Sequence, residues 1–384
     1  MEKFLMLRLN TYATGLLLIV LAAPVALIVE DLSSISLIPT LFYGVALLFF
    51  ARLFYVSGYV AVIPFITLVS TFLYAVLISF FVGINVFNLI ELAFLLSFLY
   101  AFYLKKNIDI NHFKIRCYFV GLIYAAYVFF STLYIDSTIN YLRFTYFLPI
   151  VIVIAGVYAA NKKRIILNSI ILGLCTLLLM QFMGRYPIIF SFFAVLTYFA
   201  ATSKHTVIFF IGLLAIISIY ATQIIELFSS MSWFIRTMYW EDGLDNSRLT
   251  LYTEYLSKFH EFYLTGYGVG NTDVKLYDYV GQYPHNLFAH AVSDLGIFGL
   301  LLCIILLSQF ISAFISFIKA RKILVAMKDK DSLISLDSIF LIFLYVLFLF
   351  NKSGSFYDIY PLIAITIVLK KGSSAISKHA IKWS

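Results

Sequence analysis

The chain has 384 residues, of which 63% are hydrophobic and 12% are charged, and its formal net charge is +8. Soluble domains typically have about 45 to 50% apolar and about 25% charged residues, so this composition excludes an ordinary water-soluble protein. The positive charge is spread over the connections between apolar stretches, and no basic patch on a soluble fold indicates a nucleic-acid partner. Cys117, Cys175 and Cys303 have neither metal-ligand nor disulfide-framework spacing, so we expect them in the core.

Apolar stretches of about 17 to 25 residues, the length that an α-helix needs to cross the hydrocarbon core, recur along the whole chain. They predict an all-α, polytopic membrane protein with about twelve transmembrane helices. The first stretch follows Lys3 and Arg8, but no small-residue cleavage site with a soluble domain follows it, so we expect a helix and not a signal peptide. The expected spans are residues 12–29, 35–56, 59–82, 86–104, 117–135, 144–160, 165–182, 186–203, 206–228, 286–318, 333–350 and 356–369.

The lysines and arginines predict the orientation, because basic residues are retained on the cytoplasmic side of a membrane. With the N-terminus inside, the inner connections hold most of the 27 basic residues. The outer connections hold Arg143, Arg185, Arg236, Arg248, Lys258, Lys275 and Lys352. This pattern predicts cytoplasmic termini and three consecutive parts: helices 1 to 9 in residues 1–228, a large outer loop in residues 229–285, and helices 10 to 12 with a cytoplasmic tail in residues 286–384.

The outer loop is much longer than the other outer connections, and loops of this length in compact proteins are usually functional or disordered. Its tryptophans and many tyrosines favour an ordered segment. Residues 246–263 predict an amphipathic helix that lies at the outer membrane surface. One helical stripe of this segment contains Tyr252, Tyr255, Leu256, Phe259 and Tyr263.

Arg248 lies four residues before Tyr252, on the apolar stripe and in the first turn of the expected helix. The helix dipole disfavours a cation there by about 0.3 kcal/mol or more. Two interpretations are open. Arg248 either reaches the lipid headgroups as an interface residue, or it binds an anion such as a diphosphate together with the free N–H groups of the helix start.

Arg185 lies in Gly184-Arg185-Tyr186-Pro187, between two apolar stretches with almost no loop around it. A cation this close to the membrane core is costly unless it faces a polar cavity or an anion, which favours a functional role over an interface anchor. Arg143, in the outer loop 136–143, is a weaker case of the same kind.

The stretch PHNLFAHAVSDLGIFGLL, residues 284–301, places polar groups at the start of an apolar helix that we expect to continue to residue 318. Pro284 and Asn286 are typical of a helix start and cap. His285 is then expected at the outer face of the membrane, where a neutral imidazole can take a proton from a hydroxyl. Asp294 is expected about two and a half turns deeper, on the opposite side, with a partner on another helix.

Glycines stand out in two further segments. Gly296 and Gly299 provide small surfaces for close helix packing. Gly266-Tyr-Gly-Val-Gly270 follows a helix and lacks the Lys-Ser/Thr ending of a nucleotide-binding loop, so we expect a tight turn that leads back to the membrane.

These segments together resemble the bacterial O-antigen polymerases and O-antigen ligases. The ligase pattern is His-(Asn/Ser/Gln), nine residues, Gly, two residues, and Gly, Thr or Tyr. His285-Asn286, Gly296 and Gly299 satisfy it at every position. Asn246-Ser-Arg248 with its helix, followed by the glycine-rich turn, is similar to the family's approach to this motif. Gly184-Arg185 is similar to the start of an arginine-bearing helix in the middle of such chains, and the resemblance covers about residues 180–300.

The resemblance implies a glycosyltransferase that acts on sugar chains attached to undecaprenyl diphosphate at the periplasmic face of the bacterial inner membrane, without a metal or other cofactor. It implies catalytic roles for His285, Arg248 and Arg185, and substrate-binding roles for Arg143, Asn286, Arg236, Gly268 and Gly270. The expected partners are the lipid-linked oligosaccharide, membrane lipid and a chain-length regulator protein.

Three functions remain open. A polymerase joins the growing chain to another lipid-linked repeat unit, whereas a ligase transfers it to lipid A-core; the aromatic-rich, divergent character outside the motif favours the polymerase. A flippase or transporter of lipid-linked sugars belongs to another class. It would place ionisable residues near the middle of the membrane on broken helices, whereas here Glu91 and Asp294 are the few buried candidates and polar residues gather in the outer loop.

Overall fold

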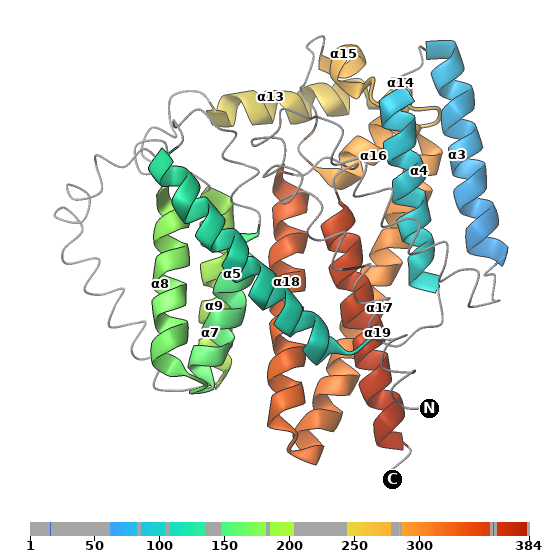
Figure 1. Cartoon of the computed structure of the whole chain (residues 1–384). Helices are drawn as coiled ribbons and strands as arrows, with labels where there is room; N and C mark the ends of the chain where they lie inside the picture. Colours follow the sequence, from blue (N-terminus) through green and yellow to red (C-terminus); the bar gives the residue numbers. More distant parts are fainter. Residues whose placement is uncertain are drawn as a thin grey trace. The chain divides into compact units, whose positions relative to one another are not determined.

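A computed structural model gives the architecture of residue 16 and of residues 62–82, 86–103, 108–134, 147–181, 185–202, 244–277, 284, 286–353, 356 and 359–381. These residues form α-helices and one short 3-10 helix, Ala101–Tyr103, joined by turns, and no strand occurs among them (Figure 1). The expected all-α fold is therefore confirmed for the described residues.

Four helices of the described residues are long and apolar enough to cross a membrane. They are α3 (Val62–Val82), Ile110–Phe130 within α5 (Ile110–Tyr134), α17 (Ile297–Met327), and Lys330–Phe350 within α18 (Lys330–Ser353). Large apolar side chains stay exposed on them; Phe80 and Phe81 of α3 are 72% and 77% exposed. Such surfaces are unfavourable in water and favourable in lipid, which supports a membrane-embedded protein. The expected spans 12–29, 35–56 and 206–228 lie outside the described residues, apart from residue 16.

The chain divides into two compact units, and each unit combines segments that are distant in sequence. Unit 1 contains Met1–Phe113, Asn246–Asp329 and Val346–Ser384, and unit 2 contains Lys114–Asp245 and Lys330–Tyr345. The three consecutive parts expected from hydropathy follow the order of the sequence, whereas the units follow the packing of the helices.

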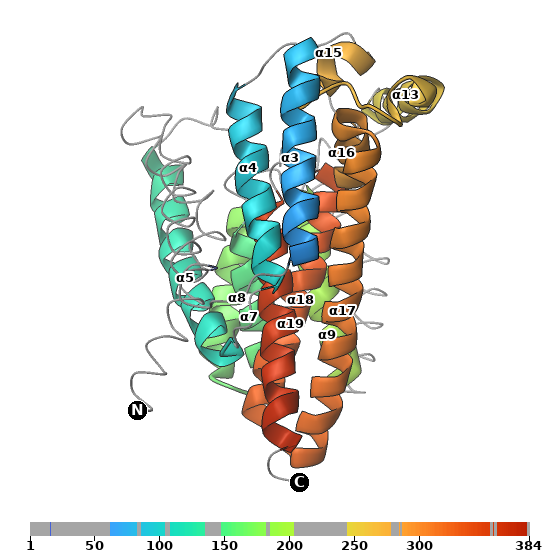
Figure 2. The ribbon, with the colours of Figure 1, turned by 90° about the vertical axis from the view of Figure 1, so that its right-hand side faces the viewer.

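Unit 1 contains four long helices: α3, α4 (Val86–Tyr100), α17 and α19 (Tyr360–Ile381). α17 and α19 lie side by side, and α3 lies beside α4 (Figure 2). The Tyr74 ring of α3 stacks on the Phe298 ring at the start of α17, with 4.3 Å between centroids. The Tyr360 hydroxyl at the start of α19 donates to the Glu91 carbonyl near the start of α4, at 2.9 Å. The end of α3 and the starts of α4, α17 and α19 therefore meet at one end of unit 1, which we call the loop end.

Three short helices of the segment that the sequence predicts as the outer loop cover the loop end: α13 (Leu244–Ser257), α14 (Phe259–Phe262) and α15 (Thr272–Tyr277). They share a small apolar core formed by Leu251, Tyr255, Phe262, Leu276 and Tyr277. The expected helix over residues 246–263 is interrupted at Lys258, whose φ of −92° and ψ of 3° leave the helical region. The Lys258 ammonium donates to the Leu276 carbonyl at 2.7 Å, which joins this interruption to α15.

Unit 2 is organised around α7 (Leu148–Ala160), which packs against α8 (Ile165–Gln181) and α9 (Arg185–Thr202). Nearly every residue of α7 is buried, as expected for a helix that is apolar on all sides. A tight basic turn, residues 161–164, connects α7 to α8. The Asn168 amide donates to the Lys163 carbonyl at 2.7 Å, and the Lys163 ammonium pairs with Asp331 of α18, so polar side chains fix this turn.

Candidate functional site

The chain reverses direction at Gly296, between α16 (Leu287–Leu295) and α17. Gly296 has φ 56° and ψ −129°, a conformation that side chains other than glycine rarely adopt. The Cys303 sulfur lies 3.8 Å from the Phe288 carbonyl oxygen, although 15 residues of continuous helix would separate these positions by about 22 Å. The expectation of one helix over residues 286–318 is therefore wrong, because α16 folds back along the first two turns of α17.

The reversal also changes the depth order of the polar residues. Because α16 runs back along α17, its start at Asn286 lies near the second turn of α17, whereas Asp294 lies at the loop end. The sequence predicted the opposite order, with Asp294 deeper than the helix start. A straight helix was assumed in that prediction, and the fold-back at Gly296 inverts it.

The backbone of the glycine-rich turn, residues 266–270, lies very close to the backbone of the α16–α17 junction. A Cβ atom on Gly266 would lie 2.3 Å from the Asp294 carbonyl oxygen, and one on Gly296 would lie 2.3 Å from the Leu264 carbonyl oxygen. The Gly268 N–H donates to the Asp294 carbonyl at 3.0 Å. Only glycine allows this backbone contact, so the expected tight turn is confirmed and its reason is the close approach of the loop to the α16–α17 junction.

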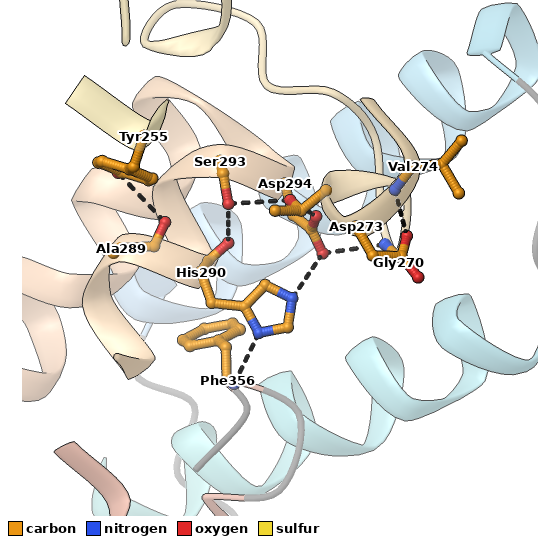
Figure 3. A network of polar contacts seen from close by, with 10 residues as sticks. Tyr255, Gly270, Asp273, Val274, Ala289, His290, Ser293, Asp294 and Phe356 are labelled. Carbon is orange, nitrogen blue, oxygen red and sulfur yellow. Dashed lines mark hydrogen bonds and ion pairs between the residues drawn. The ribbon is translucent and has the colours of Figure 1, made fainter. Parts of the chain in front are cut away.

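The Asp294 carboxylate is the centre of a buried polar network (Figure 3). Its Oδ2 accepts the Gly270 N–H at 2.9 Å and lies 3.6 Å from His290 Nε2. Its Oδ1 is hydrogen-bonded by the Thr272 hydroxyl. The partners of Asp294 thus come from the glycine-rich turn, from its own helix one turn earlier, and from Thr272 at the start of α15, so a partner on another helix, as expected, is among them.

His290 was not among the residues that the sequence singled out. It is 7% exposed, and its Nδ1 accepts the Phe356 N–H at 3.3 Å. Because Nδ1 accepts, the proton of the neutral ring lies on Nε2 and faces the Asp294 carboxylate. The i, i+4 spacing of His290 and Asp294 was the available signal, since such residues lie on one face of a helix. Both ring nitrogens are engaged, so His290 joins α16 to the segment before α19.

Two further contacts fix α16 under the loop helices. The Ser293 hydroxyl donates to the His290 carbonyl at 3.0 Å and lies 2.8 Å from the Thr272 hydroxyl. The Tyr255 hydroxyl of α13 donates to the Ala289 carbonyl at 3.2 Å (Figure 3). α13, α15 and α16 are consequently joined by polar contacts as well as by the apolar core.

Tyr267, in the glycine-rich turn, belongs to the same end of unit 1. Its hydroxyl donates to Glu261 Oε2 at 2.8 Å. Burial, together with the hydrogen bond and the negative charge of Glu261, raises the pKa of Tyr267. Tyr267 is therefore protonated at neutral pH and acts as a hydrogen-bond donor.

Asn286 has the role that its position predicted. Its side-chain oxygen accepts the N–H groups of Phe288 at 3.0 Å and of Ala289 at 3.1 Å, so it caps α16. Gly268 and Gly270 use their N–H groups to bind Asp294, and their predicted contact with substrate stays a prediction.

The structure describes less of the predicted arginines and of His285 than of Asn286. Arg248 lies in α13 of unit 1, and Arg185 is the first residue of α9 in unit 2; only their backbones are described. His285, Arg143 and Arg236 lie outside the described residues. Among the described residues, no group of three or more His, Cys, Asp or Glu side chains has the geometry of a metal site.

No protein-family model matches this chain, and no curated protein matches it. The chemistry of the candidate site therefore rests on its residues and their arrangement. The described residues bring α13, the glycine-rich turn and α16 together in unit 1.

Replacement of Gly299 by alanine should destabilise the protein. A Cβ atom at this position would lie 1.9 Å from the Ala291 carbonyl oxygen, so α16 would have to move away from α17. We expect a loss of about 1 to 3 kcal/mol, seen as a lower unfolding temperature of the purified protein in detergent. The control is Gly173→Ala in α8, where no atom lies within 4 Å of the added Cβ and the unfolding temperature should not fall. Equal effects of the two substitutions would contradict the close packing.

Two substitutions of His290 should have different effects on the Phe356 amide. Asparagine places an acceptor near the position of Nδ1, whereas glutamine places polar atoms near Nε2 and leaves the Phe356 N–H without its acceptor. We expect His290→Gln to speed hydrogen exchange at Phe356 on the order of 2 to 10 fold, and His290→Asn to have a smaller effect. Mass spectrometry of exchanged peptides that span residue 356 measures this. Exchange at Phe356 that is faster in His290→Asn than in His290→Gln would refute the assigned hydrogen bond.

Proposed function

We propose that this chain is an O-antigen polymerase, which joins undecaprenyl-diphosphate-linked repeat units at the outer face of the bacterial cytoplasmic membrane. The observation that carries the proposal is the meeting of three separate segments at the loop end of unit 1. These are the helix with Arg248, the turn Gly266–Gly270, and the stretch from Asn286 to Gly299. They are the segments on which most of the resemblance rests, and their assembly supports a shared site.

The reaction needs one bond to form and one to break. The hydroxyl oxygen of the acceptor sugar attacks the anomeric carbon of the donor, and the bond from that carbon to the undecaprenyl diphosphate oxygen breaks. His285, next to the capped start of α16, positions the hydroxyl and takes its proton. Arg248 neutralises the charge that develops on the leaving diphosphate. The same role for Arg185 follows from the sequence alone, since Arg185 belongs to unit 2.

The proposal includes the twelve-span topology, with cytoplasmic termini and the outer loop in the periplasm. In this arrangement the fold-back of α16 places Phe288, two residues after Asn286, beside Cys303, about 9 Å along α17 from its first residue. The proposed site is thus recessed below the loop helices, toward the lipid that carries the donor. Water is less abundant at such a position, which strengthens the interaction between an arginine and a diphosphate.

The described residues favour an enzyme over a transporter. Asp294 lies at the loop end of α16 with its carboxylate bound to the loop, and Glu91 of α4 is exposed. A transporter would instead place ionisable residues on broken helices near the middle of the membrane, where it would bind its substrate.

A strain that lacks this chain tests the proposed function by its lipopolysaccharide ladder. We expect lipid A-core with a single repeat unit, because the ligase of the cell still transfers the unpolymerised unit. Bare core with accumulated lipid-linked polymer would identify a ligase instead. Bare core without periplasmic lipid-linked sugar would identify a flippase.

His285 and Asn286 separate catalysis from helix capping. We expect His285→Ala to lower turnover by about 10² to 10⁴ fold while donor binding is retained, because the imidazole acts on the acceptor hydroxyl. Asn286→Ser should be nearly silent, because serine caps a helix about as well as asparagine. The assay is transfer between lipid-linked repeat units by the purified protein, with donor binding measured separately. Unchanged turnover in His285→Ala would exclude an essential role for this residue.

A further inference from the structure

The α13–α14 segment has two different apolar faces. Leu251, Tyr255 and Phe262 point inward and form the core with α15. A second set of apolar side chains stays exposed, with Leu256 69% and Leu264 54% accessible. This exposed set, which we call the outer face, consists of Tyr252 and Leu256 of α13, Phe259 of α14, and Tyr263 and Leu264 directly after α14.

The outer face differs from the stripe expected from the sequence. Tyr255 was expected on it, but the structure turns this residue inward, where its ring lies 4.9 Å from the Phe262 ring. Leu264 joins the face instead. The rings of Phe259 and Tyr263 stack on each other at 5.7 Å, so the aromatic part of the face is a continuous surface.

The outer face is continuous with an exposed apolar stripe of α17. The Leu264 carbonyl accepts the Ile297 N–H at 3.1 Å, so the end of the outer face touches the first residue of α17. From Ile297 onward, α17 exposes apolar side chains over several turns: Ile297, Leu300, Leu301, Ile304, Leu307 and Ile311. α17 is long and apolar enough to cross a membrane, so this stripe faces lipid in a membrane-embedded protein.

Exposed polar side chains accompany the outer face along the same segment. Ser257, His260 and Glu261 are exposed, and His260 Nδ1 lies 3.1 Å from the Ser257 carbonyl oxygen. A helix with one exposed apolar face and one exposed polar face is stable at a boundary between lipid and water. Tyrosine and phenylalanine suit this boundary because their rings contact acyl chains and the tyrosine hydroxyl reaches water.

We propose that the outer face of α13–α14 is a membrane-docking surface, and that the lipid bilayer which covers α17 extends over it at headgroup depth. The occupant is lipid because the face is an extension of the lipid-facing stripe of α17, joined to it through Leu264 and Ile297. At the same time, the inward side chains Leu251, Tyr255 and Phe262 pack against α15 and attach α13–α14 to the rest of unit 1. The α13–α14 segment thus lies beside the start of α17 and is held there by these inward side chains. This inference does not depend on the proposed function.

The docking surface has a consequence for the helix that carries Arg248. Arg248 lies four residues before Tyr252, about one helical turn earlier in α13. Docking of Tyr252 in the interface therefore places the backbone of Arg248 at the depth of phospholipid phosphates. A lipid-linked diphosphate would lie at the same depth.

Environment-sensitive fluorescence tests this docking. Single cysteines replace Leu256, Phe259 or Ser257, and each is labelled with a nitrobenzoxadiazole dye in the full chain, reconstituted in phosphatidylethanolamine and phosphatidylglycerol vesicles. Cys117, Cys175 and Cys303 are buried, and the unsubstituted protein gives their background labelling. Ser257 is the matched control, because it is exposed and adjacent to Leu256 but is one of the exposed polar side chains.

We expect blue-shifted emission at positions 256 and 259, with quenching by lipids that carry a doxyl group near the headgroup, and neither effect at position 257. Equal, unquenched emission at the three positions would overturn the proposal. Crosslinking of position 256 to itself between two chains, without lipid quenching, would also overturn it and identify a second copy as the occupant. A labelled protein that elutes like the unlabelled one in size-exclusion chromatography shows that each variant is folded.

Discussion

The contact of two backbones at Gly266 and Gly296 is the constraint on which the loop end of unit 1 depends. Each glycine has a positive φ, and each occupies a position where a Cβ atom would overlap a carbonyl oxygen of the other segment. This contact allows the Ile297 N–H to reach the Leu264 carbonyl and the Gly268 N–H to reach the Asp294 carbonyl. The loop therefore pairs with the α16–α17 junction through its main chain, which is a more rigid connection than side-chain contact alone.

The buried carboxylate of Asp294 follows from this contact. A charge with 1% exposure is stable only if it is paired and hydrogen-bonded, and the loop supplies the Gly270 N–H and the Thr272 hydroxyl. His290 adds a third neighbour and connects the network to Phe356. Three parts of the chain, the outer loop, α16 and the segment before α19, are thus held around one carboxylate. The network holds α16 from His290 to Asp294, and the cap formed by Asn286 lies at the start of the same helix.

The same arrangement relates the proposed site to the membrane. The fold-back moves the start of α16 below the loop helices, and the outer face of α13–α14 lies beside the first turn of α17. In the two proposals together, the outer face lies at headgroup depth and the start of α16 lies below it, on the lipid side. The proposed polyprenyl-linked substrate would stay in the bilayer, and the proposed site would reach its diphosphate without extraction of the lipid.

The sequence by itself determined the class of this protein and the places of its special residues. The apolar content predicted helices that suit a membrane, because backbone polar groups in lipid must be bonded within the segment. The position of Asn286 directly before an apolar stretch predicted the helix cap, and the glycines predicted close backbone contacts. Capping and close approach both depend on local backbone chemistry. Tertiary structure alone decided the reversal at Gly296, since a glycine between two apolar stretches permits both a straight and a folded helix. It also decided the partners of Asp294, the inward direction of Tyr255 and the importance of His290. These depend on contacts between residues such as His290 and Phe356, which are 66 positions apart, and helical periodicity carries no information on such contacts.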